Sequence, residues 1–432
     1  MVLNQRSLFD ISAAASSRSR DAFAAFVRDF RWGTRRTAVG TTEAEVESRV
    51  FRVETFTNEF WTSRQRAASR LHEVSYRACF KPQLPRFFIE RLAKPGQTVY
   101  DPFMGRGTTV IEAALLSRRP FGCDVNPLSA ILVQPRLRPP QLDEVQRRLA
   151  SIEWSLDGDP PDDLLAFYHR ETLREICALR AYLLARADAG ALDDVDAWIR
   201  MVAVNRLTGH SPAFFSVYTL PPNQAVTVAA QRKINERRGL VPPRRSVPEL
   251  ILLKSRSLLS DCDAATRQTL ERSGKHALML TASASATPEI LSSSVDLVVT
   301  SPPFLDVVNY ATDNWLRCWF CGIDADAVKL TMARKLDEWT MTMSQVFAEL
   351  SRVLKPGGHV AFEVGEVRRG RVRLEQHVIP CGIHAGLEPV LVLINSQEFT
   401  KTAKCWGVDN NDKGTNTNRV VLFRKRIRRR RG

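Results

Sequence analysis

Two consecutive prolines follow an apolar run at residues 295–304, which read VDLVVTSPPF. Proline has no backbone N–H and cannot continue a central strand, so the strand that the run predicts must end at Ser301. The corner that follows carries the Ser301 hydroxyl, the backbone carbonyls of Pro302 and Pro303, and the aromatic ring of Phe304. These groups form a stiff polar corner at the end of a buried strand.

Strand patterns alternate with helix patterns on both sides of this corner. Short apolar runs predict seven strands, at 98–100, 121–123, 277–280, 295–299, 359–364, 390–394 and 419–423. Helices are predicted between several of them, including 109–117 after a glycine-bearing turn and 338–354 before a Pro-Gly-Gly turn. The alternation predicts an α/β fold with a doubly wound, mostly parallel, seven-stranded Rossmann-like sheet.

The strand pattern is interrupted once, and the interruption sets the domain organisation. Residues 138–276 show helical patterns, notably at 164–185 and 194–206, with few strand signals. We therefore predict a largely helical inserted module, a candidate for target recognition, that splits the sheet domain into two parts. The predicted units are an accessory segment with one amphipathic helix (1–55), the first part of the sheet domain (56–137), the module (138–276), the second part (277–423) and a basic tail (424–432).

The chain is basic, with 62 Lys and Arg against 47 Asp and Glu and a formal net charge of +15. A basic surface favours the phosphate backbone, so nucleic acid is the expected partner. The run 424–431 carries seven of these charges, and the rest of the chain keeps +8 (15 minus 7). The run fits either a solubilising end or a phosphate clamp that ignores base sequence.

The remaining composition indicates an ordinary globular chain. No apolar run approaches the roughly 20 residues that a membrane helix needs, and the N-terminal residues lack the apolar centre of a signal peptide, so we expect a cytoplasmic location and no membrane contact. The eight scattered cysteines indicate reduced core thiols. Only Cys318 and Cys321 are close in the chain, and with no second pair we expect no metal site.

Three unusual peptides fall at predicted strand ends: DPFMGRGTT at 101–109, DVNP at 124–127 and SPPF at 301–304. In doubly wound sheets such ends meet in one crevice. Gly105 and Gly107 allow backbone to approach a ligand, and the following helix directs free N–H groups at it. Asp124 can accept both hydroxyls of a ribose. Each peptide alone also fits an ordinary turn or helix cap, but together they predict a pocket for an adenosine joined to a short charged group.

The third corner suits chemistry on the exocyclic amine of a nucleobase. Such an amine is a poor nucleophile because its lone pair is delocalised into the ring, and catalysis needs acceptors that hold its hydrogens. The Ser301 hydroxyl and the Pro302 carbonyl can be those acceptors at a hydrogen-bond distance of about 3 Å. Phe304 can stack on a base that has been turned out of the duplex. The alternative is a strand stopped by an ordinary proline turn.

Taken together, these residues resemble the S-adenosylmethionine-dependent amino-methyltransferases of DNA. The peptide beginning at Asp101 is similar to the family's cofactor motif, Asp124 to its ribose-binding acid, and the peptide ending at Phe304 to its catalytic tetrapeptide. Phe80 and Lys81 resemble an extra motif that flanks the cofactor. The resemblance implies S-adenosylmethionine as cofactor. It implies as cofactor-binding residues Phe80, Lys81, Asp101, Pro102, Phe103, Gly105, Gly107, Thr108, Thr109 and Asp124, and as catalytic residues Ser301, Pro302, Pro303 and Phe304.

The resemblance also implies a target. Ser-Pro-Pro-Phe is more typical of members that modify cytosine N4, and Asp-Pro-Pro-Tyr of members that modify adenine N6, so we expect a DNA cytosine-N4 methyltransferase. Adenine N6, an RNA base, and a non-catalytic nucleic-acid-binding protein that keeps the fold are the alternatives, and a restriction partner fits this family. Residues 205–239 of the module combine basic, amide and aromatic side chains that suit contacts with the target.

Overall fold

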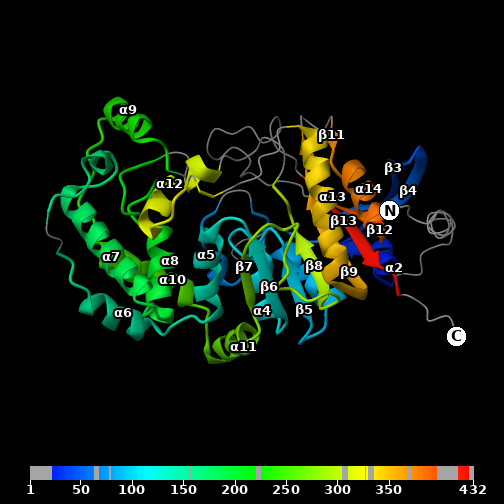
Figure 1. The fold of residues 1–432 in the computed structure, drawn as a ribbon, viewed down its shortest axis with the longest axis horizontal. Coiled ribbons are helices and arrows are strands. Elements are labelled where there is room, and N and C mark those ends of the chain that lie inside the picture. Colours follow the sequence, from blue (N-terminus) through cyan, green and yellow to red (C-terminus); the bar gives the residue numbers. More distant parts are fainter. Residues whose placement is uncertain are drawn as a thin grey trace.

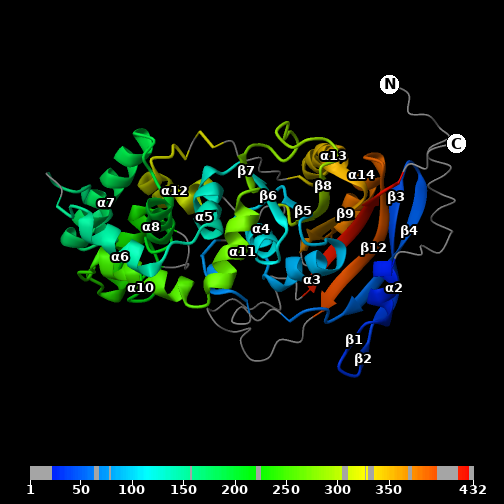
Figure 2. The same ribbon diagram turned by 90° about the horizontal axis from the view of Figure 1, so that it is seen from below.

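The structure is a computed structural model, shown in Figures 1 and 2. It describes residues 22–62, 68–76, 79–155, 158–219, 225–303, 310–325, 327–328, 335–367, 372–396 and 417–427. Three predictions lie outside these residues: the role of residues 1–21, the stacking role of Phe304, and the end of the basic tail at 428–432.

The predicted α/β sheet is confirmed, and all seven predicted strands are present. They are β5 (Thr98–Asp101), β6 (Arg119–Asp124), β7 (Leu278–Thr281), β8 (Val295–Thr300), β9 (Leu354–Val364), β12 (Leu387–Ser396) and β13 (Thr417–Lys425). Their spatial order is β7-β6-β5-β8-β9-β13-β12, and β13 alone of the seven runs antiparallel to its neighbours. The strand order reverses between β5 and β8, where a ligand crevice is expected.

The sheet is larger than the prediction, with nine strands instead of seven. A hairpin of β3 (Ala38–Val46) and β4 (Arg49–Asn58) adds to its edge, because β4 pairs in parallel with β12. The predicted boundary between residues 55 and 56 therefore falls inside β4. In β3 only alternate residues of the second half are buried, and so short a buried pattern is a weak strand signal in the sequence.

Helices cover both faces of the sheet. On one face lie α13 (Leu336–Val353) and α14 (Glu375–His384), and on the other lie α2 (Ala22–Asp29) and α3 (Gln83–Leu92). Strand β8 shows the consequence: Val298 packs with the first pair, whereas Leu297 and Val299 pack with the second. Neighbouring side chains of a strand point to opposite faces, so a strand covered on both faces is apolar at nearly every position.

The predicted module is largely helical, with irregular stretches at 205–219 and 239–246. It contains α6 (Leu142–Ser151), the short helix η3 (Asp162–Ala166), α7 (Arg170–Asp188), α8 (Asp194–Val204), α9 (Val228–Arg238), α10 (Val247–Leu259) and α11 (Ala264–Gly274). The prediction of a single helix over 164–185 is wrong. The short helix η3 ends at Ala166, and α7 begins after His169, whose side chain caps it by accepting a hydrogen bond from the Glu171 N–H.

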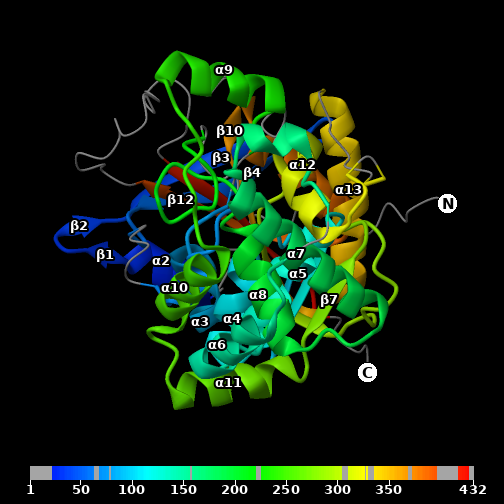
Figure 3. The same ribbon diagram turned by 90° about the vertical axis from the view of Figure 1, so that its left-hand side faces the viewer.

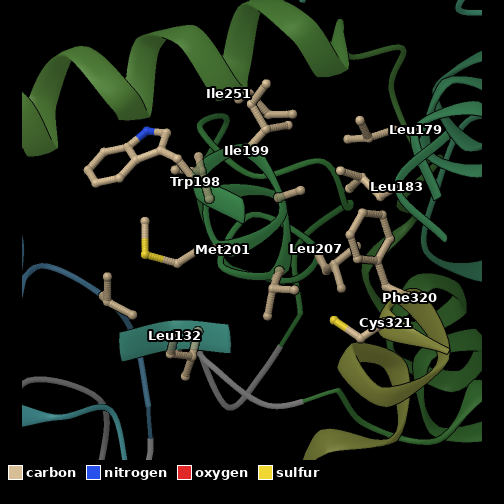
Figure 4. Packing of buried hydrophobic residues seen from close by; sticks show 14 of the residues in the cluster. Leu132, Leu179, Leu183, Trp198, Ile199, Met201, Leu207, Ile251, Phe320 and Cys321 are labelled. Atoms are coloured by element: carbon tan, nitrogen blue, oxygen red, sulfur yellow. The ribbon is translucent and has the colours of Figure 1, made fainter. Parts of the chain in front are cut away.

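Two helices, α12 (Tyr310–Cys321) and α11, pack in a different unit from the one that the predicted domain boundaries assign to them. Helix α12 follows β8 in the chain but packs in the helical module (Figure 1), where Arg180 Nε donates to the Trp319 carbonyl (2.8 Å). Figure 4 shows the core that α7, α8, α10 and α12 share, around Trp198 and Phe320. Conversely, α11 packs beside the sheet against α4 (Thr108–Leu115), and Ser273 Oγ donates to the Ala114 carbonyl (3.1 Å).

The predicted start of the basic tail at residue 424 is also wrong. Arg424 and Lys425 are the last residues of β13. Arg424 pairs with Glu388 at 3.2 Å, and Lys425 Nζ donates to the carbonyls of Ser351 and Leu354. A sequence of consecutive cations gives no sign of these pairings, because the three partner residues lie far away in the chain.

The remaining elements are the helix α5 (Pro127–Leu137) and several shorter ones. The shorter ones are β1 (Arg31–Trp32), β2 (Arg35–Arg36), η2 (Arg70–His72), β10 (Glu366–Val367) and β11 (Val372–Arg373). Within the described ranges, no helix is long and apolar enough to cross a membrane, and no group of His, Cys, Asp and Glu side chains is arranged to hold a metal ion. The seven described cysteines are free thiols.

Candidate active site

Asp101 ends β5 and organises the turn that follows. Its Oδ1 accepts hydrogen bonds from the Phe103 N–H (3.1 Å) and from the Thr300 hydroxyl (2.6 Å) at the end of β8. The side chain is 1% exposed. Burial raises the pKa of Asp101 to about 7, although both hydrogen bonds favour the charged form and oppose the rise. Asp101 therefore ties the first corner to the third and faces the protein interior.

The two glycines of the turn have different neighbours. Both adopt left-handed backbone conformations, with φ of +48° at Gly105 and +75° at Gly107. A β-carbon on Gly107 would lie 2.4 Å from Cγ2 of Val133, so this glycine permits α4 to pack against α5. A β-carbon on Gly105 would lie 3.5 Å from the ring of Tyr76. Gly105 therefore lies against the ring of Tyr76, at ordinary contact distance.

The threonines that begin α4 serve the interior. Thr109 is fully buried, and its hydroxyl donates to the Val299 carbonyl of β8 at 3.0 Å. Thr108 is 3% exposed and accepts a hydrogen bond from Arg106 Nε at 3.2 Å. The start of α4 agrees with the prediction, and the Thr109 hydroxyl ties the first turn of this helix to β8.

Asp124 remains accessible at the end of β6. It is half-buried, and its two oxygens accept from the backbone N–H groups of Gly105 (Oδ2, 2.9 Å) and Asn126 (Oδ1, 2.9 Å). Burial raises the pKa of Asp124, and these hydrogen bonds oppose the rise. A carboxylate offers about four acceptor sites, so Asp124 can still accept the two hydroxyls of a ribose.

A segment that precedes the turn, residues 68–76, forms one wall of the site. Arg106 donates to the carbonyl of Val74 at 3.0 Å, and Asn126 Nδ2 donates to the Tyr76 hydroxyl at 3.1 Å. Tyr76 therefore lies between Gly105 and Asn126, next to Asp124. Sequence reasoning assigned no role to Tyr76 or Asn126. For Asn126 a signal was available, because it is a polar residue directly after the Asp-Val dipeptide.

Phe80 and Lys81 lie at the rim of this wall. Both are half-buried, and Phe80 packs against the core beneath α3. Burial lowers the pKa of the Lys81 ammonium group, and the nearby Arg106 guanidinium lowers it further. Of the two other predicted cofactor residues, Pro102 is buried and Phe103 is half-buried against the core.

The proline corner is held by residues from two other strands. In the parallel pairing of β8 with β9, Thr300 lies opposite Phe362, which brings Ser301 beside Glu363. The Ser301 hydroxyl donates to the Glu363 carboxylate, and the Asn418 side-chain amide of β13 donates to the same group. Glu363 is 7% exposed, and burial raises its pKa against these two hydrogen bonds.

The two proline carbonyls have different surroundings. Trp339 Nε1 of α13 donates to the Pro303 carbonyl at 3.0 Å, which fixes the corner against the helix. Pro302 is buried, and no described residue donates a hydrogen bond to its carbonyl. Ser301 is half-buried and Pro303 exposed. Among the described residues, the Pro303 carbonyl therefore has a donor and the Pro302 carbonyl has none. Sequence reasoning missed Glu363, Asn418 and Trp339, because nothing near Ser301 in the chain points to them.

Sequence comparisons relate this chain to DNA methylases. A family model for N6/N4 methyltransferases, described as DNA methylase, matches residues 36–130. The chain is 21% identical over 302 residues to the type II methyltransferase M.BsoBI of Geobacillus stearothermophilus, covering 64% of this chain and 57% of that protein. It is 34% identical over 84 residues to the type II methyltransferase M.MvaI of Kocuria varians, covering 19% of this chain and 18% of that protein. The matches thus span less than two thirds of either relative.

Among solved structures, the rRNA methyltransferase aviRa from Streptomyces viridochromogenes matches 83% of this chain and 90% of its own, at 15% identity and a TM-score of 0.32. This similarity is too low to support an argument about function. The family model and the two type II methyltransferases match by sequence. Over the matched residues the chain is therefore similar to the amino-methyltransferase family of DNA methylases, whose members use S-adenosylmethionine as cofactor.

Proposed function

We propose that this protein transfers a methyl group from S-adenosylmethionine to the exocyclic amine of a base turned out of DNA, with cytosine N4 as the target. The observation that carries the proposal is the hydrogen bond between Thr300 and Asp101, which fixes the catalytic corner directly against the cofactor turn. Members of the family act on cytosine N4 or adenine N6, and the serine at position 301 favours cytosine. Adenine N6 is the second candidate.

The corner at residues 124–127 and the adjoining wall, residues 68–76, suit S-adenosylmethionine. Asp124 would accept the ribose hydroxyls, and the Gly105 turn and the Tyr76 ring that lies against it would border the ligand. Lys81 at the rim would attract the cofactor's carboxylate. When bound, the cofactor supplies a methyl group on a sulfonium, whose C–S bond breaks as the new N–C bond forms.

Ser301 would act as an acceptor for the target amine. Its own proton is directed at Glu363, so its oxygen lone pairs point elsewhere and can accept an N–H of the base. The Pro302 carbonyl would accept the second N–H. Holding both hydrogens in this way keeps the nitrogen lone pair free to attack, because it opposes delocalisation into the ring.

Glu363 would act through Ser301 on the charge that the reaction creates. The amine becomes cationic as the N–C bond forms, and a carboxylate one hydrogen bond away stabilises that charge in a water-poor site. The surplus amine proton can pass to Ser301 as the Ser301 proton moves to Glu363, which leaves the serine neutral. The raised pKa of Glu363 suits a carboxylate that accepts a proton.

The test is a methyl-transfer reaction with isotope-labelled S-adenosylmethionine and duplex DNA, followed by mass spectrometry of the nucleosides. We expect labelled N4-methyldeoxycytidine. Label only in N6-methyldeoxyadenosine would move the target to adenine, and label in neither nucleoside would contradict the proposal. A Ser301→Ala variant provides the background rate.

A further inference from the structure

We propose that the hairpin of β1 and β2, with its turn at Gly33–Thr34, binds the phosphate backbone of duplex DNA beyond the target base. We call residues 31–36 the arginine ribbon. Figures 2 and 3 show it projecting from the body of the molecule, beyond α2. The inference rests on the proposed methylation of DNA. It adds a DNA contact surface that the resemblance to DNA methylases does not predict.

The charge of the arginine ribbon is concentrated and unbalanced. Arg31, Arg35 and Arg36 are exposed, and no hydrogen bond or ion pair joins their side chains to any described residue. The stretch from residue 30 to residue 42 contains no Asp or Glu. Other exposed arginines of the described chain do have a carboxylate partner, for example Arg28 with Glu54 at 2.6 Å. The ribbon therefore presents three cations to solvent.

Strand register brings two of these cations face to face. Arg31 is paired directly with Arg36, and Trp32 with Arg35. Like charges directly opposite each other destabilise a strand pair, and an isolated two-stranded hairpin is only marginally stable. An anion between Arg31 and Arg36 would remove this repulsion. The phosphate oxygens of DNA supply that anion, and arginine is suited to hold them because its guanidinium donates two parallel hydrogen bonds.

The base of the ribbon is fixed to the sheet, so its position is defined before any ligand binds. The Thr37 hydroxyl donates to the Phe30 carbonyl at 3.0 Å, and Asn58 Nδ2 donates to Thr37 Oγ1 at 3.1 Å. Asn58 is fully buried at the end of β4. A pre-positioned contact loses little conformational entropy on binding.

The sheet topology places the arginine ribbon on the ligand-binding edge. Ala38, two residues after the ribbon, pairs with Thr57 near the carboxyl end of β4. Strand β4 runs parallel to β12 and in the same direction as β8. Five strand spacings separate β8 from β3, and at about 4.8 Å each they span roughly 24 Å, or about seven base pairs at about 3.4 Å per pair.

That separation decides what the ribbon can recognise. A contact about seven base pairs from the flipped base lies outside a short target sequence, and arginines on phosphates carry no sequence information. Arg31 and Arg36 share one face of the hairpin, and the exposed Trp32 lies with Arg35 on the opposite face. The arginine ribbon is therefore a positioning and affinity element that is indifferent to base sequence.

The experiment compares two triple variants with the full-length protein. Arg31→Gln/Arg35→Gln/Arg36→Gln removes the ribbon charge, whereas Lys94→Gln/Arg119→Gln/Arg272→Gln removes the same charge from exposed residues near the amino ends of β5, β6 and β7. Binding to a fluorescent duplex of about 40 base pairs is measured by anisotropy over a range of salt concentrations, without cofactor.

We expect the ribbon variant to bind about 10- to 100-fold more weakly and to lower the slope of log K against log salt by about 1.8, or about 0.9 for each of the phosphate contacts of Arg31 and Arg36. The matched control should change both quantities far less. Equal losses in the two variants, or no duplex binding by the wild type, would overturn the proposal. Arg31→Lys/Arg35→Lys/Arg36→Lys should restore most of the salt slope.

The ribbon proposal and the proposed methyltransferase function can fail independently of each other. The binding assay involves no methyl transfer, so a protein that methylates neither base can still show ribbon-dependent binding. Conversely, a protein that methylates cytosine N4 while the ribbon variant binds DNA like the wild type would retain the proposed function and lose the ribbon. Thermal unfolding of each variant checks that the charge changes leave the fold intact.

Discussion

The Thr300 hydroxyl lies 2.6 Å from Asp101 Oδ1, so the last residue of β8 is hydrogen-bonded to the last residue of β5. Both side chains are buried. The bond spans the point where the strand order reverses, and it joins the peptide that precedes Ser301 to the peptide that forms the cofactor turn. The relative position of the two corners therefore depends on this contact.

Thr300→Val tests that dependence. Valine has nearly the same shape as threonine but cannot donate, so Asp101 loses one hydrogen bond inside the protein. We expect the free energy of unfolding to fall by about 1 to 3 kcal/mol, measured by urea denaturation at pH 7. Thr300→Ser, which keeps the hydroxyl, is the matched control and should recover part of the loss. A Thr300→Val protein as stable as the wild type would show that the bond contributes nothing.

Asp101 should also make stability depend on pH. Burial raises its folded-state pKa to about 7 from an ordinary value of 3.8, so between these two values the folded protein binds more protons than the unfolded chain. The contribution of Asp101 to stability is therefore greatest below the ordinary value and declines as pH rises toward about 7.

Asp101→Asn cannot titrate, so the stability of this variant relative to the wild type should increase as pH rises from about 4 to about 7, by at most about 1.4 kcal/mol per pH unit for one proton. Urea denaturation at several pH values measures it. A constant difference across that range would mean that Asp101 keeps an ordinary pKa.

Asp124→Ala should weaken binding of S-adenosylmethionine by about 1.5 to 3 kcal/mol, because hydrogen bonds to a charged group are lost. Titration calorimetry measures the affinity. Asp124 also accepts from the Gly105 and Asn126 N–H groups, so Asp124→Asn, which retains one acceptor oxygen, separates loss of the ribose contact from collapse of the turn. Unchanged cofactor affinity in both folded variants would remove Asp124 from the cofactor site.

Ser301→Ala should lower the single-turnover rate of methylation while leaving the affinities for cofactor and DNA nearly unchanged, because Ser301 matters most as the amine becomes cationic. Loss of a general acid–base contact of this type typically costs about 10²- to 10⁴-fold. Wild-type methylation by Ser301→Ala would reduce the proline corner to an ordinary turn.

Glu363→Gln tests whether the carboxylate acts through Ser301. The substitution keeps the size of the side chain and removes its charge, so the rate should fall and its dependence on pH should weaken. If the two residues act as a unit, the double variant with Ser301→Ala should be no slower than the slower single variant. If the loss of activation free energy in the double variant equals the sum of the losses in the two single variants, the residues have independent roles.

The sequence by itself determined the features that arise from neighbouring residues. Prolines at 302 and 303 end β8, left-handed glycines shape the turn after β5, and apolar runs specify the strands. Backbone dihedral limits and hydrophobic periodicity act over a few residues, so they can be read without knowledge of distant parts of the chain. The α/β fold and the three corners follow from such local constraints.

Only the tertiary structure decided which partners those corners have. Glu363 and Asn418 meet Ser301 because β8, β9 and β13 pair in one particular register. Gly107 is required by Val133 of α5. A shift of one residue in a strand pairing would turn every side chain to the other face. These contacts depend on how segments far apart in the chain align, and a polar residue in a strand does not reveal which side chain will lie opposite it.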